Sequence, residues 1–157
     1  MNKVPYILLI AVVLMACSGS KTCQIADDIA LQIGFYSDSI DSAGNRVEYV
    51  KPIDSITVQG IGSDSILYNN TKNATSISLP LHNTLTTTSY ALIVNGMPDT
   101  LTVNHQNNDF FVSMECGCFT YHVIEDVTET ANLFDSVAYI NFDIGRTQTE
   151  NIRLFRH

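Results

Sequence analysis

The sequence predicts an all-β fold, a single antiparallel β-sandwich of immunoglobulin-like type with eight or nine strands, for which a small closed β-barrel is the alternative. Three observations predict this class. From Ile29 onward, apolar and polar residues alternate in short runs, which is the period of a half-buried strand. The runs are rich in β-branched and aromatic residues. No amphipathic segment of about ten residues, as a helix packed on a sheet would need, is visible.

The first strand is expected over 29–36, where Ile29, Leu31, Ile33 and Phe35 share one face. Asn95-Gly96 separates two later runs and predicts a tight hairpin, because both residues accept positive φ. The further expected strands cover 55–60, 76–81, 87–95, 100–105, 110–116, 119–125, 136–144 and 151–155.

The segments between these runs predict turns and loops. Residues 62–75 are rich in Asn, Ser and Thr and are expected to form a long exposed loop. Asn107-Asn108 predicts a weaker turn, and Gly117 predicts a bulge or bend within a strand. Residues 126–134 are expected to hold one short helical turn. No internal repeat or second domain is visible.

The N-terminus has the three parts of an export signal. Lys3 precedes an apolar run over 6–16, which is too short for a spanning helix of about 20 residues. The run ends in Leu14, Ala16 and Cys17, which resemble the lipobox of bacterial lipoproteins. The resemblance implies cleavage before Cys17 and attachment of acyl chains such as palmitate to that cysteine, whereas the alternative is a soluble, cleaved periplasmic protein. The chain therefore divides into a signal peptide (1–16), a lipidated tether (17–26) and one β domain (27–157).

Composition limits the partners and the address. Removing residues 1–16 from 157 leaves 141 residues with seven Lys and Arg against sixteen Asp and Glu, a net charge of −9. Such a surface repels nucleic acid and anionic lipid. The five residues after Cys17 contain no acidic residue. This segment therefore does not resemble the acidic surface-export tags of Bacteroidetes lipoproteins. We expect a lipid-anchored protein on the periplasmic face of the outer membrane.

Three cysteines remain after Cys17 is used by lipid, and an oxidising compartment favours a disulfide between two of them. Cys116 and Cys118 have the same strand parity, so a bridge between them would be strained unless Gly117 bends the chain. The expected bridge links Cys23 to one of them and closes a loop of about 93–95 residues. The alternative is a redox or copper site formed by Cys116 and Cys118, with His122 as a further ligand.

Six of the eleven Asp residues precede a hydroxyl residue and then an apolar one. The structural interpretation is that Asp begins a turn and the hydroxyl residue enters a strand. The second interpretation is that these triplets resemble the O-glycosylation signal of Bacteroidetes envelope proteins. The hydroxyls that would carry sugar are Ser39, Ser42, Ser55, Ser65, Thr100 and Ser136.

No catalytic motif was found, and we expect no cofactor, no resident metal and no catalytic residue. The lipobox, the β-rich body and the Glu115-Cys116-Gly117-Cys118 motif together resemble a family of uncharacterised Bacteroidetes lipoproteins. That resemblance implies no assigned activity. The leading hypothesis is a non-catalytic envelope module that binds a protein, glycan or lipid partner. The alternative is a periplasmic thiol-redox or copper-handling protein that uses Cys116 and Cys118.

Overall fold

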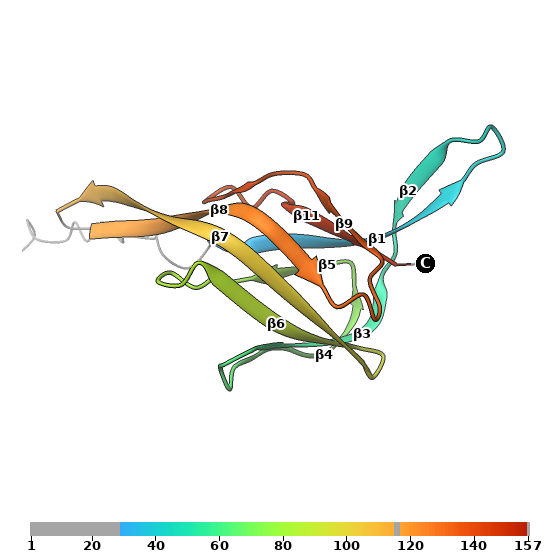
Figure 1. Ribbon diagram of the computed structural model, residues 1–157, viewed down its shortest axis with the longest axis horizontal. Coiled ribbons are helices and arrows are strands. Elements are labelled where there is room, and N and C mark those ends of the chain that lie inside the picture. The colour runs from blue at the N-terminus through green and yellow to red at the C-terminus, as the bar shows by residue number, and fades with distance from the viewer. Residues whose placement is uncertain (1–28, 115–116, 157) are drawn as a thin grey trace, which may run out of the picture.

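The computed structural model describes residues 29–114 and 117–156, and in these residues it contains strands and no helix. Two sheets form a β-sandwich, which confirms the predicted fold class, and they do not close into a barrel (Figure 1). The described residues form eleven strands in place of the eight or nine expected. They are β1 (Leu31–Ile40), β2 (Arg46–Val50), β3 (Ile53–Gly60), β4 (Ile66–Ala74), β5 (Ser76–Leu79), β6 (Thr87–Val94), β7 (Met97–Ser113), β8 (Gly117–Glu129), β9 (Ser136–Tyr139), β10 (Asp143–Ile144) and β11 (Ile152–Phe155).

The first sheet has the order β2-β1-β11-β9, with β5 also paired to β1. Its β1–β11 pair is parallel, whereas the other pairs of this sheet are antiparallel. The second sheet is antiparallel and has the order β10-β8-β7-β6-β3-β4. The two sheets enclose one hydrophobic core among the described residues.

The core follows from the alternation in the sequence. Leu31, Ile33 and Phe35 of β1 are buried, as the period of two predicted. Alternate residues of β3, β6, β7 and β11 meet them from the other strands of the sandwich. Phe35 stacks on Phe134 with ring centroids 5.8 Å apart, which ties the β8–β9 connection to the core.

The hairpin predicted at Asn95-Gly96 is confirmed. Both residues have positive φ, 51° and 84°, and Val94 pairs with Met97 across them. This geometry suits the right-handed twist of the paired strands β6 and β7.

Three local predictions are wrong. Residues 66–74, expected in a loop, form β4 at the edge of the second sheet. Asn107-Asn108 makes no turn, because β7 runs without interruption from Met97 to Ser113. Residues 126–129 continue β8 instead of forming a helical turn.

Gly117, expected at a bulge or bend, lies at the first position of β8 and has a positive φ of 70°. The pairing of β7 with β8 shifts register beside it, between Phe111 and Ser113.

The two ends of the sandwich differ. The hairpin of β7 and β8 projects from one end, and the hairpin of β1 and β2 projects from the opposite end (Figure 1). Because β1 has ten residues at about 3.3 Å each, its two ends lie about 33 Å apart.

Candidate functional site

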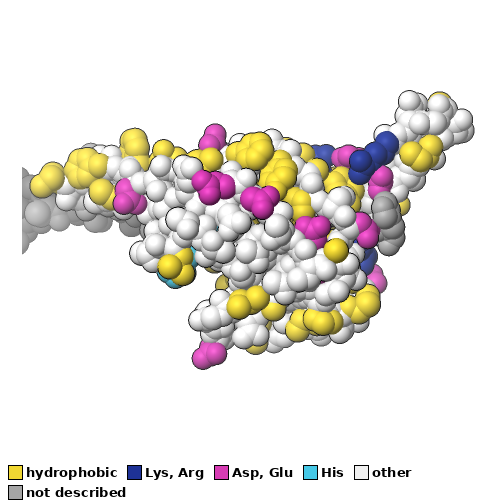
Figure 2. All heavy atoms as spheres, in the orientation of Figure 1, with side chains coloured by type: hydrophobic (Ala, Val, Ile, Leu, Met, Phe, Trp, Pro, Cys, Tyr) yellow, Lys and Arg dark blue, Asp and Glu magenta, His cyan; other side chains and the backbone are white. Residues whose placement is uncertain are grey.

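The projecting end of the β7–β8 hairpin carries exposed apolar side chains. Phe110, Phe111, Val112 and Met114 are 54%, 57%, 36% and 92% exposed, and we call these four residues the apolar tip. Hydrophobic side chains are visible along this arm of the molecule (Figure 2). Large apolar side chains gathered on a soluble domain mark an interaction surface more often than isolated ones do.

The apolar tip is supported by regular strand pairing. Phe110 lies opposite Phe119, with ring centroids 5.3 Å apart, and Phe111 lies opposite Cys118. One residue further from the end, Thr120 donates a hydrogen bond of 2.7 Å to the Asp109 carboxylate. Phe110 and Phe111 are therefore held by the strand ladder, whereas Met114 follows the last residue of β7.

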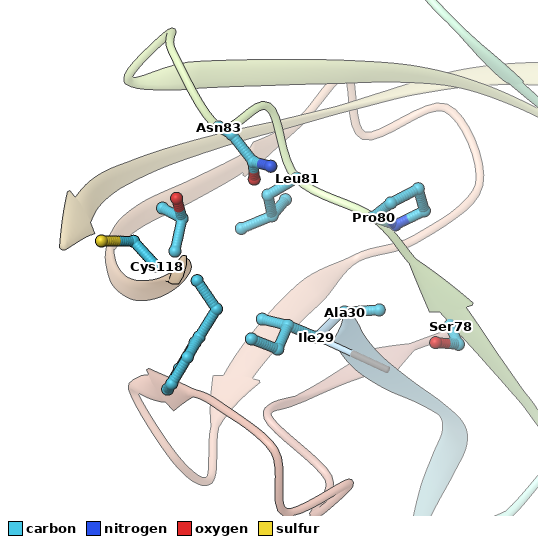
Figure 3. A pocket seen from close by; sticks show the side chains of 9 residues that line it. Ile29, Ala30, Ser78, Pro80, Leu81, Asn83 and Cys118 are labelled. Atoms are coloured by element: carbon cyan, nitrogen blue, oxygen red, sulfur yellow. The ribbon is translucent and has the colours of Figure 1, made fainter. Parts of the chain in front are cut away.

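A pocket of about 550 Å³ lies beside the projecting part of this hairpin (Figure 3). One wall is formed by Cys118, Phe119 and Thr120 of β8, the first two of which pair with Phe111 and Phe110. Ile29, just before β1, and Leu81, just after β5, line it from the body of the domain, and Leu81 belongs to the core on which Ile29 packs. The chain therefore enters the described domain beside the hairpin that carries the apolar tip. The remaining lining residues are Ala30, Ser78, Pro80 and Asn83.

Behind the pocket lies a polar cluster centred on Asn107 of β7. Its side-chain oxygen accepts hydrogen bonds from Nδ1 of His105, at 2.9 Å, and of His122, at 2.8 Å. Because an amide oxygen only accepts, we assign the proton of each ring to Nδ1. The Asn107 amide nitrogen donates to the carbonyl oxygens of His82 and Leu85, at 3.1 and 2.8 Å.

The cluster extends to β6 through Thr88. The backbone N–H of His82 donates to the Thr88 hydroxyl, at 3.0 Å, and that hydroxyl lies 2.9 Å from Nε2 of His105. With the His105 proton on Nδ1, Nε2 accepts the hydroxyl proton. We call His82, Thr88, His105, Asn107 and His122 the Asn107 network. The acceptor role of Nε2 requires the ring of His105 to be neutral.

Burial keeps the rings of His105 and His122 neutral. Both are almost inaccessible, and burial lowers the pKa of each. Burial and then the charge of nearby His105 bring the pKa of His122 to about 4. The rings contact edge to face, with centroids 5.1 Å apart. The Asn107 network is therefore a structural clasp that joins the 82–85 loop to β7 and β8.

Residues 55–156, which run from β3 to the end of β11 and include the β7–β8 hairpin, match the model of a family of unknown function, DUF6452. The chain belongs to this family. The expectation of an uncharacterised family without assigned activity is therefore met. The DUF6452 match starts after β1, although β1 pairs with both β5 and β11 of the matched part. Comparison with curated proteins and with solved structures finds no match.

The expected cysteine chemistry of this DUF6452 member falls partly outside the described residues. Cys17, Cys23 and Cys116 lie there, so lipidation and disulfide pairing stay predictions. Cys118 is exposed at the edge of the pocket, and no other cysteine lies among the described residues to pair with it. His122 is four residues further along β8, and its Cα therefore lies about 13 Å from that of Cys118. One ion with ligand bonds of about 2.0–2.3 Å would not reach both side chains at that spacing.

The six hydroxyl residues that follow an Asp differ in their exposure to solvent. Ser39, Ser42, Ser65 and Ser136 are exposed, whereas Ser55 and Thr100 are half-buried. Asp99 is buried and accepts backbone N–H groups of Leu133 and Phe134, at 3.0 and 3.3 Å, and the Thr130 hydroxyl. The Asp99 carboxylate therefore holds the turn after β8 by hydrogen bonds.

Sequence reasoning missed the Asn107 network and a second polar cluster around Glu150. The Glu150 carboxylate accepts from the Tyr36 hydroxyl, at 3.1 Å, and from Arg153 Nε, at 2.6 Å. The Arg153 guanidinium also lies 4.4 Å from the centre of the Tyr36 ring. A Cβ on Gly34 would collide with Glu150, which accounts for glycine inside β1. No local motif in the sequence marks either cluster.

Among the described residues, no three His, Cys, Asp or Glu side chains are placed to hold a metal ion. The described part of the chain also has no helix that is long and apolar enough to cross a membrane. What this end of the domain offers is an apolar tip on a supported hairpin, a pocket beside it and the exposed Cys118.

Proposed function

We propose that this protein is a membrane-anchored envelope lipoprotein whose β-sandwich is a non-catalytic binding module. The lipobox residues Leu14, Ala16 and Cys17 and the resemblance to Bacteroidetes lipoproteins support the anchor. The absence of acidic residues over 18–22 supports the periplasmic face of the outer membrane as its place. Two or three acyl chains hold a protein firmly, since each buried CH₂ contributes about 0.8 kcal/mol.

The observation that carries the binding role is the apolar tip. A domain that forms a complete core leaves Phe110, Phe111 and Met114 in solvent at the end of its longest hairpin. Exposed apolar side chains at a strand end promote aggregation unless they have a partner. We infer that the tip is the binding element.

The non-catalytic role is supported by the state of the histidines. His105 and His122 spend their Nδ1 protons on Asn107, and Thr88 supplies the partner for His105 Nε2. Ring nitrogens that are buried and already hydrogen-bonded within the protein are poorly placed to exchange a proton with a ligand.

The alternative is a thiol-redox or copper-handling role for Cys116 and Cys118, and the exposed Cys118 thiol beside the pocket favours it. In this alternative the ligands or redox partners come from the cysteines themselves, because His122 is held in the Asn107 network. Alkylation of thiols before and after reduction, followed by peptide mass spectrometry, separates the two functions. A copper-loaded or mutually bridged Cys116–Cys118 pair favours the alternative.

The anchor is tested by metabolic labelling with an alkyne-bearing palmitate and by membrane fractionation. We expect the wild type to be labelled and membrane-bound, and Cys17→Ser to be unlabelled. Cys118→Ser is the matched control and should be labelled like the wild type. Labelling of Cys17→Ser would overturn the proposal.

Glycosylation at Asp-Ser steps forms part of the proposal. Ser39, Ser42, Ser65 and Ser136 are accessible to a modifying enzyme on the folded domain. Sugar at these positions would leave the apolar tip uncovered, because none of them belongs to the β7–β8 hairpin.

A further inference from the structure

We propose that residues 82–85 form an acid-released strap, which neutral histidine side chains hold closed between two neighbouring pockets and which opens when those side chains bind protons. We call residues 82–85 the strap. Its opening joins the two pockets into one larger groove. The proposal concerns the body of the sandwich and depends neither on the membrane anchor nor on the apolar tip.

The strap belongs to a wall that the two pockets share. Leu81 and Asn83 line the pocket of about 550 Å³ beside Cys118 (Figure 3). A second pocket, of about 240 Å³, is lined by Leu81, His82 and Thr88 and by residues around the β3–β4 turn. Because Pro80 and Leu81 line both pockets, the segment that runs from them into the strap separates the two.

The ring of His82 closes the strap upon itself. The backbone nitrogens of Thr84 and Leu85 each lie 3.3 Å from its Nδ1. A backbone N–H only donates, so Nδ1 is the acceptor and the His82 ring is neutral with its proton on Nε2. A proton on Nδ1 converts this acceptor into a donor, and both hydrogen bonds within the strap are then lost.

Thr88 and Asn107 fasten the strap to the sheet. The Thr88 hydroxyl accepts from the backbone N–H of His82, at 3.0 Å, and donates to Nε2 of His105, at 2.9 Å. The Asn107 amide donates to two strap carbonyls, because its oxygen is turned towards the rings of His105 and His122. A second proton on His105 removes the acceptor of the Thr88 hydroxyl and leaves a charged ring whose hydrogen-bond partners are neutral.

The bonds on either side of the strap do not involve a histidine side chain. Before it, the Tyr90 hydroxyl donates to the carbonyl oxygen of Pro80, and Leu81 is buried in the core. After it, the backbone N–H of His105 donates to the carbonyl oxygen of Thr86, at 2.8 Å. Opening is therefore confined to the strap, with hinges at Leu81 and Thr86, while the strands stay paired.

The surroundings of the two buried rings disfavour a proton while the strap is closed. His105 and His122 are 0% and 1% exposed, and their ring centroids are 5.1 Å apart, so two charged rings would repel each other. Other elements add these groups: His82 from the strap and Glu125 from β8 act on His105, β6 contributes the neutral Thr88, and β10 places Ile144 opposite His122 and Asp143 opposite Val123.

The closed strap therefore binds protons less readily than the open one. Burial is the main cause that lowers the pKa of His105, and the charge of His82 lowers it further. When the strap opens, water reaches the ring and the pKa returns towards about 6.5. The closed state is favoured above that pH and loses its advantage below it. For one such group, the equilibrium constant for opening rises by up to about 25-fold between pH 7 and pH 5.

Hydrogen exchange followed by NMR tests the proposal on the full mature protein in detergent micelles. Each exchange rate at pH 7 and pH 5 is divided by the rate of an unstructured peptide at the same pH. The amides of Thr84 and Leu85 report on the strap, and those of residues 91–94 in β6 report on the sandwich. We expect strap protection to fall at least tenfold at pH 5, whereas protection over 91–94 should change less than twofold.

Two substitutions of Thr88 test the fastening. Thr88→Val keeps the shape of the side chain but removes the hydroxyl that joins His82 to His105. It should lower strap protection at pH 7 at least tenfold. Thr88→Ser keeps the hydroxyl and is the matched control, with the pH dependence of the wild type.

Three results would overturn the proposal. The first is equal strap protection at pH 7 and pH 5. The second is a parallel loss over 91–94, which means that the whole domain unfolds in acid. The third is wild-type protection in Thr88→Val. If Thr88→Val does not fold, the ring ¹⁵N shifts of the wild type decide: strap opening should follow proton uptake by His82 or His105, and opening without it refutes the strap.

Discussion

His105 and His122 share one hydrogen-bond acceptor, the side-chain oxygen of Asn107, and their rings contact edge to face with centroids 5.1 Å apart. The two rings come from neighbouring strands, β7 and β8, and are buried just behind the projecting hairpin. The shared acceptor needs a proton on both Nδ1 atoms, and burial favours the neutral form of both rings because it lowers the pKa of each.

The first prediction is that stability falls as the pH drops from about 6.5 to about 4. The folded state lowers the pKa of His122 from about 6.5 to about 4, so the unfolded state binds the proton more readily. The stabilisation is complete above the unfolded pKa and is lost as the pH falls through the folded pKa. Its slope is up to about 1.4 kcal/mol per pH unit for this one group.

Urea unfolding between pH 4 and pH 8 measures this slope. His122→Asn removes the titrating group and should give a shallower pH dependence, although its stability at pH 7 should be lower. The same slope in wild type and His122→Asn would assign the acid sensitivity to carboxylates instead.

The second prediction concerns Asn107. Asn107→Ala removes the acceptor of two buried rings and the donor to two loop carbonyls, so it should lower the free energy of unfolding by about 2–4 kcal/mol. The neighbouring Asn108→Ala, on the opposite face of β7, is the control and should change it by less than about 1 kcal/mol. Equal effects in chemical denaturation would show that Asn107 does not hold the cluster together.

The third prediction concerns the close approach at Gly34. In Gly34→Ala the new Cβ meets the Glu150 carboxylate and the Tyr36 ring, and we expect a loss of about 1–3 kcal/mol in stability. Adding Glu150→Ala removes the obstacle, so the double variant should lose less than the sum of the two single variants. Strict additivity in a double-mutant cycle would refute the collision.

The fourth prediction is the Cys23 disulfide. Cys118 and Ile29 line one pocket, and Cys23 is six residues before Ile29, within about 20 Å of reach. A bridge from Cys23 to Cys116 or Cys118 closes a loop of about 93–95 residues, and loss of such a bridge should cost about 4–5 kcal/mol in the loop-entropy treatment. Peptide mapping under non-reducing conditions identifies the pair, and Cys23→Ser should lower the melting temperature only if that pair exists.

The fifth prediction orders the modification sites. Peptide mass spectrometry of protein from its own envelope should find sugar on Ser39, Ser42, Ser65 or Ser136 before it finds sugar on Thr100. Thr100 is half-buried, and the carboxylate of its neighbour Asp99 accepts hydrogen bonds from the backbone of the turn after β8. Sugar on Thr100 with the four exposed serines bare would argue against recognition of the folded domain.

Local patterns were sufficient for the elements that carry strong alternation. Leu31, Ile33 and Phe35 identified the buried face of β1, and Asn95-Gly96 identified the β6–β7 hairpin, because each signal depends on neighbours in the chain. The edge strand β4 lacks such a signal, since six of its nine residues are exposed and it therefore has no apolar face to alternate. The position of Gly117 at the start of β8 depends on its pairing with Ser113, which no local pattern shows.

The composition and spacing of residues thus determine the all-β class, and they predict a lipoprotein signal over Lys3 to Cys17. The packed structure alone decides that β7 continues through Asn107-Asn108, since the Asn107 side chain is bonded to His122 of β8 and to the carbonyl oxygens of His82 and Leu85. It also decides that Ile29 and the apolar tip lie at the same end of the sandwich. Both results depend on contacts between residues distant in sequence, and such contacts form only when the sheets assemble.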